Sequence, residues 1–435
     1  MNDFATNILK KLENSIALSE QNSRKFVKNP VTDFTRKRKL HYAEMIRLIL
    51  SMGGQSLKLE LLDYFSYDTD TVSCSAFVQQ REKLKPELFE SLFHDFNSKL
   101  PSAFLYEGYR LLAADGSDLN IAHNPDDPDT FQNNGSNKGF NLLHLNALYD
   151  LCNKTYVDAL IQPRIRSGEC KALIEMIERS QIEGKTIVIA DRGYESYNVF
   201  EHIAKKGWHY LVRVKDITSN GIASSLNLSC DDTFDLDYSF FMTRRQTNKI
   251  KANKDRYKFM PKNQVFDFLP FDSKAMYPYH FRILRFPIGE NSYEVIMTNL
   301  DRETFPLSKI RHLYHMRWGI ETSFRELKYA IGLQHFHAKK VAYILQEVFA
   351  KLIMYNFCAA ITTHILIVQK ERNHLYQVNF TIAIAICMRF FKCRDDTPPD
   401  VEALIAKNIL PVRPGRKDPR KVKIRTSVSF LYRVA

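Results

Sequence analysis

The sequence predicts an α/β protein in which helices flank a mixed β-sheet. Between residues 108 and 214, short apolar runs of strand length alternate with helical patterns. Two of these runs stop at an aspartate followed closely by a glycine, which is typical of buried strands whose polar ends meet at one edge of a sheet. A later stretch, 216–300, is rich in aromatic and β-branched residues and predicts additional strands.

Composition and charge narrow the class of protein. The 435 residues are enough for two or three domains, and 45% apolar and 26% charged residues are ordinary for a soluble globular protein. A net charge of +13 favours a polyanionic partner, most simply nucleic acid. The seven cysteines contain no CxxC pair, so we expect neither a zinc site nor a disulfide framework, and a reducing cytoplasm fits. We expect no signal peptide and no membrane span, because the apolar run 352–368 contains polar residues and is better explained as a buried helix.

Residues 1–107 predict a helical region. The first 37 residues are polar and end in the basic run 36–39, which suits a flexible or helical arm. Four helical patterns follow, at 41–52, 57–65, 73–84 and 86–100. The first two are separated by a glycine pair, and the third has a polar face on which we expect four exposed residues, namely Gln79, Gln80, Arg81 and Lys83. A helix-turn-helix-like DNA reader and a plain helical cap on a catalytic domain fit this order about equally.

Residues 108–215 predict the first part of a catalytic core. The expected strands are 109–115, 142–150, 155–162, 186–190 and 209–214, and the expected helices are 169–181 and 195–206. This order is that of an RNase H-like fold, in which an antiparallel three-strand unit is extended by parallel strands through right-handed crossovers. The first and fourth strands are neighbours in that fold, which would bring together the aspartates that end them, Asp115 and Asp191.

Two interpretations of Asp115 and Asp191 remain open. An aspartate at the end of a strand is often only a turn former or a helix cap. Together with an acid from a later helix, the two aspartates form a set that could hold Mg²⁺, which prefers oxygen ligands and keeps several of its waters.

Residues 216–300 predict a mostly β insertion placed before the last helix of the core. Its strand-like runs are 233–242, 256–259, 264–269, 279–286 and 293–300. Phe240, Phe241 and Tyr257 could stack on DNA bases, or could be ordinary residues of the sheet core.

The rest of the chain predicts more helix and a basic end. Residues 301–340 hold the last helix of the core, and 341–435 form a region with a long apolar helix at 341–369 and a buried helix at 380–391. The tail could be solvated or could contact phosphates. Its nine cations are residues 407, 413, 416, 417, 420, 421, 423, 425 and 433.

The stretch Tyr314–Lys328 predicts a single helix with a polar stripe. At 100° per residue, an arc of roughly 60° contains Tyr314, Arg317, Glu321 and Lys328. The apolar residues at other angles can be buried, namely Leu313, Ile320, Phe324 and Leu327. One interpretation is a solvated face on which Glu321 pairs with Arg317 and Arg325. The other is a functional face that adds Glu321 to the two aspartates.

These motifs resemble those of the DDE transposases of bacterial insertion sequences, specifically insertion sequence family 4. The third acid of that family lies in a Tyr-x2-Arg-x3-Glu-x6-Lys signature, which the stretch 314–328 matches at every spacing. Its second acid lies in an Asp-x-Gly-Tyr/Phe motif, as at 191–194, and its first acid is commonly followed by glycine and a hydroxyl residue, as at 115–117. The resemblance covers residues 38–435 and is strongest over 108–330. Relatives carry an insertion that helps to hold transposon-end DNA; a tryptophan of the insertion can take part in base flipping, whereas the two tryptophans here, Trp208 and Trp318, lie outside it.

The resemblance implies a cut-and-paste transposase. Asp115, Asp191 and Glu321 would be the catalytic residues and the ligands of two Mg²⁺ ions, for which Mn²⁺ can substitute. Water would first free a 3′-OH, and a hairpin intermediate would precede attack of the 3′-OH on target DNA. The implied partners are inverted-repeat ends, a target duplex and a second copy of the chain, in the cytoplasm at the nucleoid and with no membrane. The candidate DNA contacts are Tyr314, Arg317, Lys328, Arg325, Arg213, Arg81 and Lys83.

Two other functions fit the same residues. The core could belong to an RNase H-like nuclease or resolvase that cuts DNA without joining it. The chain could also be a domesticated DNA-binding factor that no longer cuts, although the presence of all three acids argues against that function.

Overall fold

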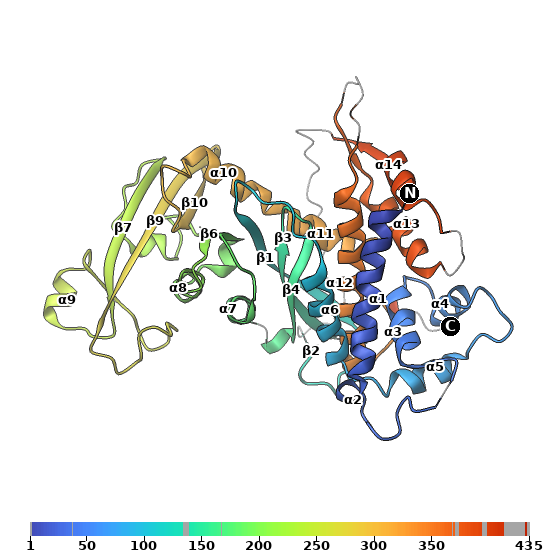
Figure 1. Ribbon diagram of the computed structural model, residues 1–435. Coiled ribbons are helices and arrows are strands. Elements are labelled where there is room, and N and C mark those ends of the chain that lie inside the picture. The colour runs from blue at the N-terminus through green and yellow to red at the C-terminus, as the bar shows by residue number, and fades with distance from the viewer. Residues whose placement is uncertain are drawn as a thin grey trace.

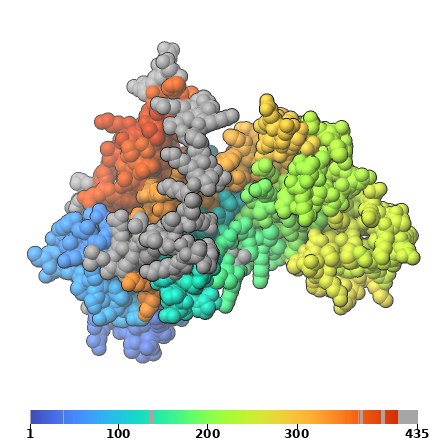
Figure 2. Space-filling view, turned by 180° about the vertical axis from the view of Figure 1, so that it is seen from behind, coloured from blue at the N-terminus to red at the C-terminus, as the bar shows by residue number. Residues whose placement is uncertain are grey.

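The protein has a helical end, a central sheet and an outlying insertion. The computed structural model describes residues 2–36, 38–133, 139–166, 168–367, 369, 374–393, 398–412 and 431–432. In Figure 1 the strands and the short helix of the insertion lie at one end, and the N-terminal and C-terminal helices lie together at the other. Figure 2, seen from behind, has the same two ends, with the helices in blue, orange and red and the insertion in yellow-green.

Within the described residues, one ten-stranded sheet runs through the middle of the protein and into the insertion. Its order is β2-β3-β1-β5-β6-β10-β9-β7-β8, with β4 also paired to β3. β1 pairs antiparallel with β3 and parallel with β5, and β5 pairs parallel with β6. The strands are β1 (Arg110–Ile121), β2 (Phe131–Gln132), β3 (Phe140–Asp150), β4 (Thr155–Pro163), β5 (Thr186–Ala190), β6 (His209–Val214), β7 (Phe234–Thr243), β8 (Tyr257–Phe259), β9 (Met276–Gly289) and β10 (Ser292–Thr298).

Both faces of the central strands are buried, because different layers cover them. Along β1, Leu111 and Ala113 belong to one hydrophobic cluster, which continues into the helical end. Leu112 and Ala114 belong to the other cluster, which includes residues of α7 (Glu169–Arg179) and α8 (Tyr197–Lys205). Successive side chains of a strand point to opposite faces, so this alternation follows from the pleat of the strand. It also explains why the predicted strands are continuous apolar runs.

The helical end is built around one long helix, α12 (Val341–His364). Helices from the start of the chain pack on it, including α1, α3 and α6. Among the described residues, α12 is the one helix long and apolar enough to span a membrane, but 94% of its most apolar window is buried inside the protein. A helix that is apolar on all sides suits such a central position, so the prediction of a buried helix is confirmed. The other helices of this end are α1 (Asp3–Gln21), α2 (Ser23–Phe26), α3 (Tyr42–Ser51), α4 (Leu57–Tyr64), α5 (Cys74–Arg81), α6 (Glu87–Lys99), α13 (Phe380–Lys392) and α14 (Val401–Lys407).

Most predicted elements are present, with three corrections. The first strand does not end at residue 115 but continues to Ile121, because β3 stays paired with it beyond that point. The long apolar helix ends at His364 instead of residue 369. Residues 264–269 form turns and not a strand. Most of the predicted basic tail lies outside the described residues.

The insertion continues the central sheet instead of forming a separate one. β10 pairs antiparallel with β6 from Val295–Val214 to Thr298–Leu211, so the insertion covers an edge that β6 would otherwise expose. Phe240 and Tyr257 are buried, which confirms the interpretation of these two residues as sheet core. The short helix α9 (Asn248–Ala252) lies at the outer end of the insertion in Figure 1.

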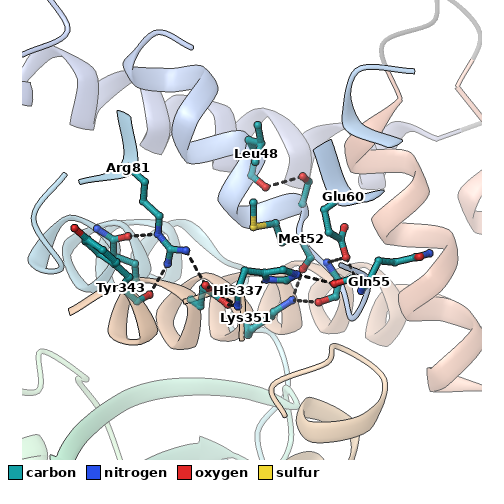
Figure 3. Close-up of polar contacts among 12 residues, drawn as sticks. Leu48, Met52, Gln55, Glu60, Arg81, His337, Tyr343 and Lys351 are labelled. Atoms are coloured by element: carbon teal, nitrogen blue, oxygen red, sulfur yellow. Dashed lines mark hydrogen bonds and ion pairs between the residues drawn. The ribbon is translucent and has the colours of Figure 1, made fainter. Parts of the chain in front are cut away.

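α5, which corresponds to the predicted helix 73–84, is anchored in the protein through its last residue, Arg81. Gln80 and Arg81 were expected to be exposed, and this prediction is wrong: both are buried, Arg81 to 2% exposure. The Arg81 guanidinium donates to Gln346 Oε1 at 2.8 Å and to Glu347 Oε1 at 2.7 Å (Figure 3). An arginine can be buried because these partners satisfy its charge and its donors.

The same buried network reaches the glycine turn between α3 and α4. Glu347 also accepts from the His337 backbone N–H, and His337 Nε2 lies 3.0 Å from the Gln55 carbonyl oxygen. Lys351 donates to the carbonyl oxygens of Met52 and Gly53 (Figure 3). Polar contacts therefore join the N-terminal helices to α12 in addition to apolar packing.

Candidate active site

The sheet register places Asp115 and Asp191 side by side. Ala114 on β1 pairs with Ala190 on β5 in a parallel register, and each aspartate is the next residue along its strand. Asp191 follows the end of β5, as predicted, whereas Asp115 lies within β1. The strand pairing that an RNase H-like order requires therefore brings the two aspartates together even though only one ends a strand.

Asp191 also has a local structural role. Its Oδ1 accepts the Gly193 backbone N–H at 2.8 Å and caps the short 3-10 helix Arg192–Tyr194. The interpretation of Asp191 as a cap is thus confirmed, and it does not conflict with a second role for the carboxylate.

Glu321 reaches the aspartates from a helix that is broken where the sequence predicted a continuous one. α10 (Leu307–Met316) and α11 (Trp318–Tyr329) meet at Arg317, so the prediction of a single helix is wrong. The Arg317 N–H donates to the Tyr314 carbonyl at 3.1 Å, and the Ile320 N–H donates to the Arg317 carbonyl at 3.1 Å. These three-residue hydrogen bonds tighten the turn locally. The predicted apolar face is confirmed as buried, with Leu313, Ile320, Phe324 and Leu327 no more than 6% exposed.

Arg317 links the first and third acids. Its Nη2 donates to Glu321 Oε1 at 2.7 Å, and its Nη1 lies 3.7 Å from Asp115 Oδ2. The residue is buried, at 6% exposure. The predicted pair of Arg317 and Glu321 therefore exists, but its arginine is buried and also reaches β1, unlike the arginine of an ordinary solvated pair on a helix surface.

The local charges favour a bound cation. Burial raises the pKa of the Asp115 carboxyl to about 6; the Gly116 N–H and Arg317 oppose this rise, whereas Asp191 and Glu321 add to it. A divalent cation would relieve the repulsion between these carboxylates, and their oxygens are the ligands that Mg²⁺ prefers. The donor set at Asp115 and Asp191 thus fits such an ion.

The acids are not yet arranged as a closed ligand set. Within the described residues, no three His, Cys, Asp or Glu side chains lie close enough together to hold a metal ion as they stand. The effect of Glu321 on the pKa of Asp115 nevertheless requires that it be nearby. Both observations are explained if the Glu321 carboxylate has to turn away from Arg317 to join the aspartates.

The predicted DNA contacts divide into a group near the acids and a group far from them. Burial raises the pKa of Tyr314, and Arg317 and Arg213 oppose the rise, so both cations lie near its phenol. Arg213, on β6, also lies 3.5 Å from Glu294. Lys328 is half-buried and donates to the Asp118 carbonyl on β1 at 3.2 Å.

The remaining candidates differ in exposure. Arg325, on α11, is exposed. Lys83 is half-buried and donates to Gln80 Oε1 at 2.9 Å, and Arg81 is enclosed by α12. The structure therefore brings Arg317 to the acids, Arg213 to Tyr314 and Lys328 to β1, and it removes Arg81 from solvent.

A second polar group beside the aspartates was missed at the sequence level. It consists of Asp118, His144, Arg164 and Glu169. Its members come from β1, β3, the segment after β4 and the first turn of α7. The three-residue spacing of Asp115 and Asp118 was visible in the sequence, but the pairing of Asp118 with His144 depends on the register of β1 and β3.

Comparisons with known proteins identify a family and a similar solved structure. A family model described as "Transposase DDE domain" matches residues 106–357, which include the two aspartates, Glu321 and all strands of the sheet. A cryo-EM structure of a piggyBac transposase synaptic complex with hairpin DNA is similar at 9% identity, covering 96% of this chain and 85% of that chain with a TM-score of 0.47. That score is too low to bear on this chain. No curated protein matches the sequence.

Proposed function

Because the chain belongs to the transposase DDE domain family, we propose that this transposase cuts the ends of an insertion sequence of family 4 and joins them to target DNA. The family makes the chain a DNA-cleaving and strand-transferring enzyme. The insertion-sequence family, its Tyr-x2-Arg-x3-Glu-x6-Lys signature and the cut-and-paste route with a hairpin intermediate belong to the proposal.

The observation that carries the proposal is the meeting of three acids from distant parts of the chain. Asp115 and Asp191 follow paired residues of adjacent parallel strands, and Arg317 ties Glu321 to Asp115. The strand order from β3 through β1 and β5 to β6 supports an RNase H-like core. The number and kind of acids support metal-dependent phosphoryl transfer.

Each acid has a distinct role in this proposal. Asp115, whose carboxyl pKa is raised by both other acids, would be the ligand shared by the two Mg²⁺ ions, and Asp191 and Glu321 would each complete one site. When bound, the two cations activate the attacking oxygen and stabilise the leaving oxygen. Arg317 forms an ion pair with Glu321 and offsets part of the negative charge of Asp115. Mn²⁺, which also accepts carboxylate oxygen ligands, can replace Mg²⁺.

Polar and basic side chains of β6 and of the segment α10–α11 position the DNA strand. Tyr314, Arg317, Lys328, Arg325 and Arg213 contact its phosphates, and such contacts fix the register of the strand without reading bases. Lys83 remains a candidate contact of the N-terminal region. The exposed face of α5, which includes Ser75, Val78 and Gln79, supports a role for residues 1–107 in recognising the ends.

The proposed organisation follows the chain. Residues 108–215 and 301–340 form the catalytic core, 216–300 the insertion, and 341–435 a helical region with a basic tail. Two copies of the chain hold the two ends of the element, and the enzyme acts on nucleoid DNA in the cytoplasm.

The test of the proposed function is Glu321→Gln. The amide keeps the shape of the side chain and loses the charge that holds a cation, so we expect cleavage in Mg²⁺ to be abolished while end-DNA binding stays within about threefold. A gel-shift assay and a cleavage assay on one end-containing duplex measure both quantities. Glu303→Gln, an exposed residue before α10, is the matched control and should cut normally. Cleavage by Glu321→Gln at a near wild-type rate would remove Glu321 from the site.

A further inference from the structure

The carboxylate of Glu169 lies against the glycines that follow both aspartates. A Cβ built on Gly116 would be 3.2 Å from Glu169 Oε1, and a Cβ built on Gly193 would be 3.1 Å from Glu169 Oε2. The absence of a side chain at both positions is therefore what allows this carboxylate to approach. Of the described residues, Glu169 is the one acid that is among the nearest neighbours of the Cβ positions of both glycines.

Glu169 reaches Asp191 around the end of β5. The Cβ position of Gly193 is 3.0 Å from Asp191 Oδ1 and 3.1 Å from Glu169 Oε2, so these two oxygens are no more than about 6 Å apart. Asp115 shares a sheet face with Ala113, whereas Gly116 and α7 belong to the opposite face. Because β5 stops at Ala190, Asp191 can be approached from both faces.

A buried histidine holds Glu169 in this position. His144 is 3% exposed, and its Nε2 lies 3.2 Å from Glu169 Oε1. Its Nδ1 is 2.7 Å from Asp118 Oδ1, which in turn lies 3.2 Å from Arg164 Nε. His144 is the most buried of the four side chains and lies between the two carboxylates, with Asp118 at its Nδ1 and Glu169 at its Nε2.

The contact between His144 and Glu169 leaves the Glu169 carboxylate able to accept a hydrogen bond from a further partner. The Nε2 of His144 is buried and makes no hydrogen bond of good geometry, although Glu169 is within ion-pair distance. Interaction with His144 lowers the pKa of Glu169 against the effect of partial burial, so the carboxylate is ionised at neutral pH. The Glu169 side chain is also 32% exposed, which leaves it open to water.

A simpler explanation of Glu169 is its place at the start of a helix. An acid in the first turn of α7 interacts favourably with the helix dipole. That role requires neither the buried His144 nor the approach to two glycines. An exposed first-turn acid would satisfy the dipole equally well.

We propose that Glu169 is a fourth carboxylate of this active site, which accepts hydrogen bonds from the waters of a divalent cation held by Asp191, and that His144 positions it. The inference rests on the proposed function, because it presumes that Asp115 and Asp191 hold the cation. Mg²⁺ and Mn²⁺ keep waters when bound to few protein ligands, and these waters need acceptors. A carboxylate about 6 Å from a ligand oxygen is suitably placed to accept from them.

The test measures Mn²⁺ binding by the DNA-free full-length protein. The electron paramagnetic resonance signal of free Mn²⁺ reports how much of the ion remains unbound. We expect Glu169→Gln to weaken Mn²⁺ binding about tenfold, and Asp191→Asn to weaken it more. Glu175→Gln, an exposed acid on the same helix, should bind like the wild type. His144→Gln, which keeps a donor, should lose less affinity than His144→Ala.

Distinct outcomes separate this inference from the proposed function. If Asp191→Asn loses Mn²⁺ and Glu169→Gln does not, Glu169 has no role in the site and the inference fails alone. If Glu169→Gln loses as much Mn²⁺ affinity as Asp191→Asn, Glu169 is a direct ligand of the ion, and the proposed hydrogen bonds to its waters are wrong. If Asp191→Asn does not change Mn²⁺ binding, the metal site itself fails and the inference with it. The circular dichroism spectrum of each variant is compared with that of the wild type. A spectrum equal to the wild type shows that a loss of binding does not come from a folding defect.

Discussion

Arg317 shows how the same ion pair can be interpreted in two ways. An Arg and a Glu four residues apart are common on solvated helices, where such a pair contributes about 0.3–0.5 kcal/mol. Here the arginine is buried while Glu321 stays partly exposed, and the guanidinium also faces Asp115 at 3.7 Å. One buried cation therefore offsets the charge of two acids that come from distant parts of the chain.

Lys328 donates to the Asp118 carbonyl on the strand that carries Asp115, and in the proposed function its ammonium contacts a phosphate of the bound strand. We expect Lys328→Ala to weaken binding to end DNA and to random DNA equally, because a phosphate contact carries no base information. It should also lower the slope of log K against log salt concentration by about one unit. Fluorescence anisotropy over a salt series measures both quantities.

The control is Lys205→Ala on α8, whose ammonium is exposed beside Glu201. It should leave the salt slope of binding unchanged. A loss of affinity confined to end DNA would mean that Lys328 contacts bases. An unchanged salt slope would mean that Lys328 only stabilises β1 through its hydrogen bond to Asp118.

The helix α5 is anchored by its own terminal residue, and this changes what it can do. Arg81 and Gln80 point into the protein, so base contacts by this helix would have to come from its exposed face, at Ser75, Val78 and Gln79. The arginine that the sequence offered to DNA instead joins α5 to α12.

We expect Arg81→Ala to lower the free energy of unfolding by about 3–5 kcal/mol, because it leaves Glu347 charged and buried without its partner. Urea denaturation measures this loss. The double variant Arg81→Met, Glu347→Leu should recover much of it, since an apolar pair of similar volume removes the unpaired charge.

A variant of the neighbouring residue, Lys83→Ala, provides the control and should cost less than about 1 kcal/mol. A stable Arg81→Ala protein with a reduced salt slope of DNA binding would contradict this assignment and return Arg81 to the DNA surface.

The net charge of +13 is concentrated in part at the outer end of the insertion. Between residues 244 and 262 there are eight lysines and arginines and one acid, Asp255. Six of the cations are exposed, namely Arg245, Lys249, Lys251, Lys254, Arg256 and Lys262. In Figure 1 this segment, around α9, lies at the opposite end of the protein from the helices. Such a surface suits the backbone of a duplex that extends well beyond the site of the cut.

We expect the triple variant Lys249→Gln, Lys251→Gln, Lys254→Gln to lower the salt slope of DNA binding by two to three units, at about 0.9 per phosphate contact. Binding isotherms at several salt concentrations, with a duplex long enough to reach the insertion, measure the slope. Neutralising three exposed lysines outside the insertion and outside residues 1–107, namely Lys154, Lys185 and Lys205, is the control. Equal effects of both triple variants would show that net charge alone governs binding.

Local patterns were sufficient to place most elements and the three acids. The strands 142–150, 155–162, 186–190 and 209–214 and the four N-terminal helices are where their periodicity predicts them, because burial of one or both faces imposes a repeat on the sequence. The spacing of Tyr314, Arg317, Glu321 and Lys328 along one segment is also a local property. Hence the mixed α/β class could be predicted from the sequence, and so could the proximity of Asp115 and Asp191.

Packing between distant segments decided the remainder, because a side chain's exposure depends on what lies against it and not on its neighbours in sequence. α12 buries Arg81, 266 positions away from Glu347. The register of β1 with β3 sets Asp118 opposite His144, and α7 then brings Glu169 to the glycines beside both aspartates. The pairing of β10 with β6 makes the insertion part of the central sheet. The break at Arg317 is hidden in the same way, since the apolar period runs through it and only the contact with Asp115 gives Arg317 its place.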